Sequence, residues 1–170
     1  MESDRFEGFR EFVLARRPAL SRTALLLTGS HHAAEELVQE ALVKAAARWR
    51  RLTAEGDPEA YLRRIMVNDR ISWWRRRRRE SAVPAVPERA SVDGSDTVNG
   101  RLDLAAALAT LPARQRAVIV LRFYEDLSVE ETAALLRCAP GTVKSQTSDA
   151  LARLRRLVPA LVETEREAIR

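Results

Sequence analysis

The chain of 170 residues is poor in several residue types that mark common protein classes. Its one cysteine, Cys138, excludes an internal disulfide and a cysteine-based zinc site. Six glycines, seven prolines and 5% aromatic residues are poor material for an all-β protein. No apolar run approaches the ~20 residues of a membrane span, and we recognise no leader of charged, apolar and small residues. We therefore expect a cytoplasmic, mostly helical protein.

Basic residues give the chain a net charge of +5, and almost all of them are arginine because only Lys44 and Lys144 are lysine. The planar guanidinium group of arginine suits phosphates and base edges. A preference for GC-rich codons is the plainer explanation of the excess of arginine over lysine. Residues 81–100 differ from the rest, since they hold three acidic side chains, one basic one, two prolines and two glycines. This composition predicts a flexible acidic linker between two helical domains.

The spacing of apolar residues predicts four helices before this linker. They cover about residues 6–13, residues 19–28 after Pro18, residues 30–51 with Ser30 as N-cap, and residues 57–74 with Asp57-Pro58 at the start.

An unusual run, Trp73-Trp74 followed by five arginines, ends the last of these helices. Neighbouring helical residues point about 100° apart, so the two indoles cannot both face one core. Aromatic rings beside a basic run suit single-stranded nucleic acid, because the rings stack on unpaired bases while guanidinium groups hold the backbone. The plainer alternative is a solvated helix end with one core tryptophan.

Residues 101–157 predict a helix-turn-helix preceded by two shorter helices, the second of which starts at Pro112. Ser128 and Glu131 form a capping box that opens a helix over residues 129–136. A turn over residues 137–141 then leads to a helix of about residues 142–157. Small polar residues at the front of an exposed helix can approach base edges in a major groove. A plain helical hairpin with a polar surface is the alternative.

Four motifs in a fixed order resemble those of one protein family. They are Ala34–Leu42, Tyr61–Asn68 with the basic aromatic run, Leu111–Val118, and Leu127–Ser145. The chain resembles a small sigma-70 factor of the extracytoplasmic-function group, similar to its actinobacterial SigE-like subgroup. The resemblance implies an all-α fold of two small helical domains joined by a flexible linker. Region 2 would cover residues 1–80, the linker 81–100, region 4 residues 101–160, and a C-terminal tail 161–170.

The resemblance also implies a function: binding core RNA polymerase, at its clamp helices and flap, and starting transcription at promoters. Residues that match the polymerase-binding helix are Glu36, Leu37, Gln39, Glu40 and Leu42, with Glu36 in place of the more usual aspartate. Residues that match the reader of the minus-ten element, and would open it, are Arg64, Asn68, Ser72, Trp73, Trp74, Arg75 and Arg76. Residues that match the reader of the minus-thirty-five element are Thr142, Lys144, Ser145, Ser148, Asp149 and Arg153.

Two positions depart from this pattern, since Gln146 and Asp149 stand where related proteins often have arginine. An anti-sigma protein is a further candidate partner. We expect no catalysis by the chain alone, no cofactor, no metal and no membrane insertion. The chain carries no nucleotide-hydrolysis motif, so promoter opening would be driven by binding alone.

Two rival functions are weighed against this one. A stand-alone helix-turn-helix regulator, with a dimerising or sensing N-terminal half, explains residues 101–157 but leaves the Trp-Arg run without a role. An enzyme would need a site such as His31-His32 with Glu35 and Glu36, which have the helical spacing of metal ligands. The chain has no other histidine, and a solvated helix start is the simpler reading.

Overall fold

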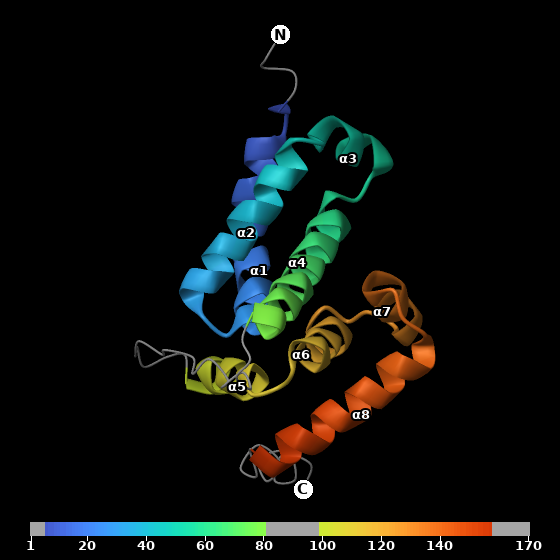
Figure 1. The fold of residues 1–170 in the computed structure, drawn as a ribbon. Helices are drawn as coiled ribbons and strands as arrows, with labels where there is room; N and C mark the ends of the chain where they lie inside the picture. Colours follow the sequence, from blue (N-terminus) through green and yellow to red (C-terminus); the bar gives the residue numbers. More distant parts are fainter. Residues whose placement is uncertain (1–5, 81–98, 158–170) are drawn as a thin grey trace, which may run out of the picture. The chain divides into compact units, whose positions relative to one another are not determined.

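The computed structural model describes residues 6–80 and 99–157 (Figure 1). All regular elements in these two ranges are helical, and the chain divides into two compact units, Met1–Ala85 and Val86–Arg170. The expected all-α class and the two helical parts are therefore confirmed. The predicted linker lies outside the described residues, apart from Asn99 and Gly100, and so does the predicted tail over residues 161–170.

Unit 1 contains four helices, as expected, but they divide the chain at other places than the sequence predicted. They are α1 (Phe9–Thr28), α2 (His31–Ala46), α3 (Trp49–Glu55) and α4 (Pro58–Glu80). The prediction of a new helix after Pro18 is wrong, because Pro18 lies inside α1. Proline removes the hydrogen bond to the carbonyl of Leu14, four residues earlier. Both residues are exposed, so water can satisfy that carbonyl.

The predicted helix over residues 30–51 is also wrong in extent, because it breaks after Ala46 and restarts at Trp49. The break turns the Trp49 indole into unit 1, where only 5% of the residue is exposed. Its Nε1 donates a hydrogen bond of 2.6 Å to the carbonyl of Glu7. Its ring lies 5.1 Å from that of Phe9 and 5.0 Å from that of Phe12. We therefore attribute the end of α2 to the packing of Trp49 against α1. The residues between 30 and 51 carry no local sequence signal for this break.

A buried arginine fixes how α4 is turned about its own axis. Arg70 is 9% exposed, and its Nε donates a 3.3 Å hydrogen bond to the carbonyl of Leu27 near the end of α1. Its guanidinium carbon lies 4.4 Å from the centre of the Trp73 ring. Around it, Leu62, Met66 and Val67 are almost fully buried. One side of α4 is thus held against α1 and α2, and the opposite side faces solvent.

Unit 2 begins with α5 (Asn99–Ala109), α6 (Ala113–Ile119) and a π-helical turn, η2 (Val120–Tyr124). Helices α7 (Val129–Leu136) and α8 (Pro140–Leu157) follow as the predicted helix-turn-helix. The capping box is confirmed: Ser128 Oγ accepts from the Glu131 amide at 3.0 Å, and Glu131 Oε2 accepts from the Ser128 amide at 2.7 Å. The last helix starts at Pro140 rather than Thr142, because proline suits the first helical position. The turn is correspondingly shorter than predicted.

Among the described residues of unit 2, one buried hydroxyl group has no hydrogen-bond partner. Thr132 on α7 is 0% exposed, and its Oγ1 has no partner in the described part of the chain. A buried, unsatisfied hydroxyl costs on the order of 1–3 kcal/mol relative to an apolar group of the same shape.

Thr132→Val should therefore stabilise unit 2 by about 1 kcal/mol. Thr147→Val is the matched control. Thr147 Oγ1 donates a 2.7 Å hydrogen bond to the carbonyl of Val143, so removing this hydroxyl group should not stabilise unit 2. All three tryptophans lie in unit 1. Denaturant unfolding of the whole chain should thus show a later transition by far-ultraviolet circular dichroism and an unchanged one by tryptophan fluorescence. An unchanged or earlier circular dichroism transition for Thr132→Val would contradict this reading.

Candidate nucleic-acid interface

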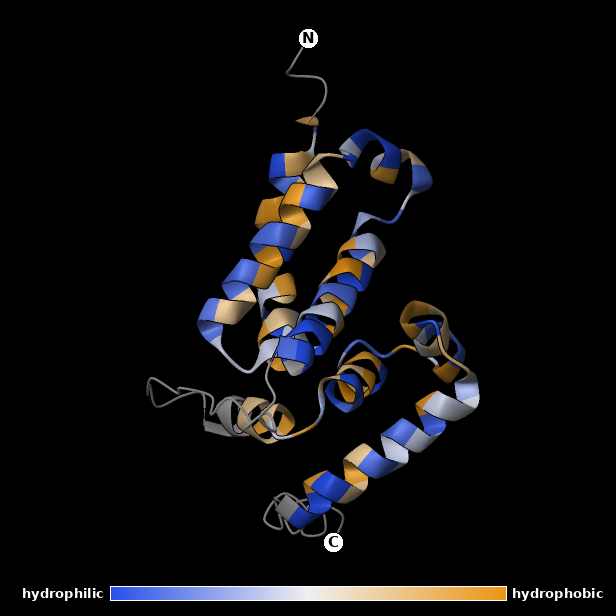
Figure 2. Cartoon of the chain, in the orientation of Figure 1, coloured by the Kyte–Doolittle hydropathy of each residue, from blue (hydrophilic) through white to orange (hydrophobic). Residues whose placement is uncertain are grey.

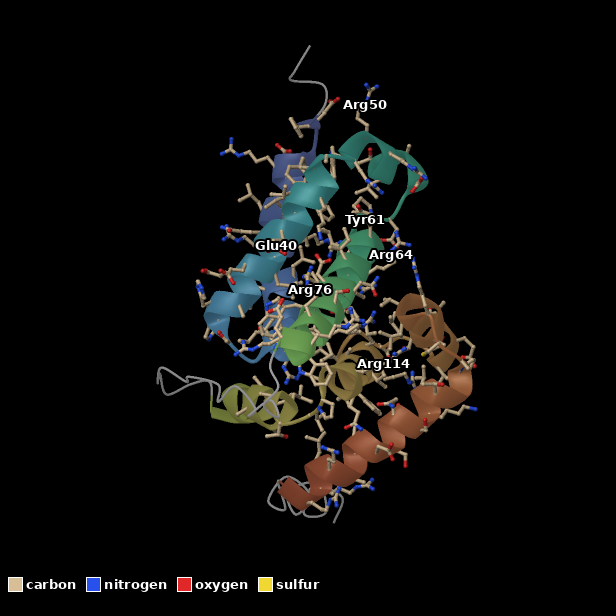
Figure 3. All side chains as sticks on the ribbon, in the orientation of Figure 1. Glu40, Arg50, Tyr61, Arg64, Arg76 and Arg114 are labelled. Carbon is tan, nitrogen blue, oxygen red and sulfur yellow. The ribbon has the colours of Figure 1, made fainter. Side chains whose placement is uncertain are left out.

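The solvent side of α4 carries a polar and basic stripe over its whole length. Its members are spaced three or four residues apart, as neighbours on one helix face are: Tyr61, Arg64, Asn68, Ser72, Arg75 and Arg79. Figure 3 shows Tyr61 and Arg64 near the beginning of α4 and Arg76 towards its other end. In Figure 2 the last turns of α4 are strongly hydrophilic. We call this surface the α4 stripe.

The structure brings five of the seven residues predicted for the minus-ten element to this side. Arg64, Asn68, Ser72 and Arg75 lie on the α4 stripe, and Arg76 lies at its edge. Trp73 and Trp74 do not share it, because helix geometry turns them about 140° and 120° away from Asn68 in opposite senses. Both indoles are half-buried on the side of α4 that faces the core. Neither ring is fully buried, so the alternative of one core tryptophan at this helix end is not found.

Trp73 is in contact with arginines of its own helix. The guanidinium carbon of Arg70 lies 4.4 Å from the ring centre, and that of Arg77 lies 5.0 Å from it. Such cation–π contacts hold the indole in place. A base can stack on a ring face that a guanidinium group covers only by displacing that group.

Tyr61 is an aromatic residue of the α4 stripe that the sequence reasoning passed over. Its ring is half-buried, and the guanidinium carbon of Arg64 lies 5.6 Å from the ring centre. Asn68 follows seven residues later, which is two turns of the same face. This spacing of seven residues is the sequence signal that could have identified Tyr61 as part of the same face.

The exposed side of α2 carries three of the five predicted polymerase contacts: Glu36, Gln39 and Glu40. Leu42 is half-buried, and Leu37 is 7% exposed and packs in the core of unit 1. Val43 was not predicted, yet it is 69% exposed and lies one turn after Gln39. Val43 therefore places an exposed apolar side chain on the same side of α2 as Glu36, Gln39 and Glu40. We call Glu36, Gln39, Glu40 and Val43 the α2 surface.

In α8 the buried side is formed by Val143 and Ala150, both 0% exposed. The predicted residues Lys144, Ser145, Ser148, Asp149 and Arg153 are exposed, and Thr142 is half-buried beside them. Ser145 Oγ donates a 3.1 Å hydrogen bond to the carbonyl of Thr142, which leaves its acceptor lone pairs facing outward. One polar face therefore collects all six residues predicted for the minus-thirty-five element.

The histidines weighed as metal ligands lie at the start of α2. His32 Nε2 is 3.3 Å from Glu36 Oε1, and both side chains are largely exposed. Over the residues that the structure describes, no group of three or more His, Cys, Asp or Glu side chains is arranged to hold a metal ion. Within the same ranges, no helix has the length and apolar character to cross a membrane.

A basic helix with a polar stripe and a helix-turn-helix with a polar outer face are together typical of a nucleic-acid-binding protein. Comparison with known families makes this specific. Residues 12–80 match sigma-70 region 2, and residues 101–154 match sigma-70 region 4. The chain belongs to the sigma-70 family of RNA polymerase sigma factors, in its extracytoplasmic-function group. Sigma factors direct promoter-dependent initiation of transcription by RNA polymerase.

Individual relatives agree with this assignment over most of their length. The RNA polymerase sigma-E factor of Streptomyces coelicolor is 42% identical over 149 residues, which cover 86% of this chain and 84% of that protein. The ECF RNA polymerase sigma factor EcfG of Rhodopseudomonas palustris is 32% identical over 155 residues, covering 89% and 86%. The Bartonella quintana sigma factor RpoE, solved with the anti-sigma factor NepR, is 34% identical, with a TM-score of 0.66 and coverage of 89% and 97%.

The contacts of Trp73 yield a prediction about stability. Arg70→Ala should destabilise unit 1 by about 2–3 kcal/mol, because it removes a buried charged hydrogen bond and the packing on Trp73. Arg77→Ala removes the other guanidinium group from the same ring, but Arg77 is exposed, and its loss should cost less than about 1 kcal/mol. Denaturant unfolding followed by tryptophan fluorescence measures both variants. Equal losses would show that Arg70 does not anchor α4.

Proposed function

We propose that this sigma factor docks on core RNA polymerase through the α2 surface, opens the minus-ten element with the α4 stripe, and reads the minus-thirty-five element with α8. The observation that carries the proposal is the α4 stripe itself. It is a basic surface with an amide, a hydroxyl and an aromatic ring, held on a rigid helix. Such a surface can neutralise phosphates and take up unpaired bases at once.

Within the α4 stripe, the arginines Arg64, Arg75 and Arg76 hold the backbone of the unpaired strand, and Asn68 and Ser72 hydrogen-bond to its bases. Tyr61 adds a ring on which a base can stack. Trp73 and Trp74 lie outside the α4 stripe, on the side of α4 that faces the core. We assign them to the edge of the opened segment, where they limit how far the strand can move towards the core of unit 1.

On α8, Thr142, Ser145, Ser148 and Asp149 face the base edges of the minus-thirty-five element, while Lys144 and Arg153 contact phosphates. Asp149 costs affinity near phosphates, but its carboxylate can accept a hydrogen bond from cytosine N4. A preference for cytosine at one position of this element follows. Half-buried Gln146 lies at the margin of the face and has a smaller part in it.

The α2 surface fits the clamp helices of core polymerase, since it combines acidic and amide groups with an exposed valine. Leu37, which sequence reasoning placed among the contacts, supports this surface from inside, and Leu42 borders it. Unit 2 offers a second contact for the polymerase flap through the exposed ring of Phe123 at the end of η2.

Opening is driven by binding alone, without catalysis by this chain and without a cofactor. Melting costs stacking energy, and capture of unpaired bases on the α4 stripe offsets part of it. Two weak readers on one chain gain effective concentration once polymerase holds both. We place the protein in the cytoplasm with its polymerase. We assign its regulation to an anti-sigma protein, because the related RpoE was solved bound to one.

The docking role predicts a loss of polymerase binding when charge is placed on the α2 surface. Val43→Asp combined with Glu40→Arg should abolish co-purification with core polymerase while the helical circular dichroism signal is kept. Leu14→Asp is the matched control, because Leu14 is an equally exposed apolar residue, 68% against 69%, on α1 instead of α2. Normal association of the double variant would refute the docking site.

The opening role predicts that variants of the α4 stripe and of α8 differ in how they depend on the template. Asn68→Ala and Tyr61→Ala should each lose on the order of 1–3 kcal/mol in transcription from duplex promoter, the usual worth of one base contact. The loss should shrink on a template already mismatched at the minus-ten element. Lys144→Ala and Ser145→Ala should lower transcription from the duplex and the mismatched template by the same factor.

Trp73→Ala and Trp74→Ala belong in the same series, with thermal stability measured beside transcription, because both rings are half-buried. Folded variants of Asn68 and Tyr61 that retain full activity on duplex DNA would show that the α4 stripe does not open the promoter.

A further inference from the structure

One ion pair joins the two helices of unit 1 that carry different proposed tasks. Lys44 Nζ on α2 lies 2.5 Å from Asp69 Oδ2 on α4. The Lys44 side chain is 49% exposed and that of Asp69 is 28% exposed. By contrast, Arg16 and Glu59 join α1 to α4, and the pairs His32–Glu36 and Arg51–Glu55 each lie within one helix.

The carboxylate of Asp69 lies where a negative charge is unfavourable for binding nucleic acid. Asp69 directly follows Asn68 and lies about 100° from it around the helix axis, at the border of the α4 stripe. Between Glu59 and Glu80, at the two ends of α4, it is the one acidic residue among eight arginines. A carboxylate at that border repels the phosphates that the stripe attracts, unless another charge neutralises it.

Folding stability does not explain the pair. Ion pairs that are about half exposed contribute little to the free energy of folding, because water screens the charges and the long side chain loses freedom. Arg16 and Glu59 form a comparable pair between α1 and α4, at 3.3 Å with side chains 54% and 34% exposed. The positions of the two residues distinguish this pair. Lys44 lies one turn after Glu40 of the α2 surface, and Asp69 directly follows Asn68 of the α4 stripe.

We propose that Lys44 is a positioning residue for promoter opening, which acts through Asp69 and not by touching DNA. Its ammonium group neutralises the Asp69 carboxylate and holds it towards α2, away from the strand that Asn68 engages. This inference rests on the proposed function of the α4 stripe. It requires that removing Lys44 impairs opening and that removing the carboxylate as well restores it.

The test uses the full chain with core polymerase, on a promoter selected by run-off transcription with the unchanged protein. Lys44→Met should lower the rate of open-complex formation about three- to tenfold at low salt, and less at high salt because the repulsion is screened. Asp69→Asn should open at the normal rate, and the double variant should return to within about twofold of it. Arg16→Met, which breaks the comparable pair with Glu59, is the control and should have no effect.

Two further measurements separate this role from a structural or docking one. Core polymerase binding and thermal unfolding should be the same for Lys44→Met and for the double variant, so that only opening distinguishes them. Normal opening by Lys44→Met, weakened core binding, or a double variant as slow as Lys44→Met would each overturn the inference. If Asn68→Ala opens duplex promoter normally, the proposed function fails. If Asn68→Ala is slow while Lys44→Met is normal, this inference alone fails.

Discussion

The orientation of α4 depends on one buried guanidinium group. Burying a charge is costly unless it is hydrogen-bonded, and Arg70 meets this need at the carbonyl of Leu27, close to the C-terminal end of α1. The negative end of the helix dipole favours a cation there. Because successive residues are fixed about 100° apart, an inward Arg70 turns Asn68 and Ser72 outward. The chemistry of the α4 stripe is thus set by a contact on the opposite side of the helix.

In unit 2, helix caps and apolar packing orient the polar side of α8 outward. The capping box at Ser128 and Glu131 starts α7, Pro140 starts α8, and Val143 and Ala150 bury one side of it. With that side buried, the small polar residues of the other side have to face outward. In both units a rigid helix presents short polar side chains, and neither surface depends on a loop to position it.

The features of this structure that could be predicted from the sequence are those determined by residues close together in the chain. The capping box, the polar front of α8 and the all-α class follow from residues close together in the chain. The break after Ala46 could not be predicted, because the packing of Trp49 on Phe9 and Phe12, some forty residues away, produces it. The same holds for Trp73, whose partners depend on the anchoring of Arg70. The burial of Leu37 could not be predicted either, because an apolar residue beside acidic ones suits both a docking surface and the edge of a core.

The central claim is that two helices of unit 1 face different partners, α4 the unpaired strand and α2 the polymerase. Site-specific photocrosslinking in a promoter complex tests it most directly, with a photoreactive residue in place of exposed Ser72 or exposed Val43. We expect position 72 to crosslink to the unpaired strand of the minus-ten element, only when core polymerase is present, and position 43 to crosslink to a polymerase subunit. Crosslinks from position 72 to polymerase alone, or from position 43 to DNA, would contradict it.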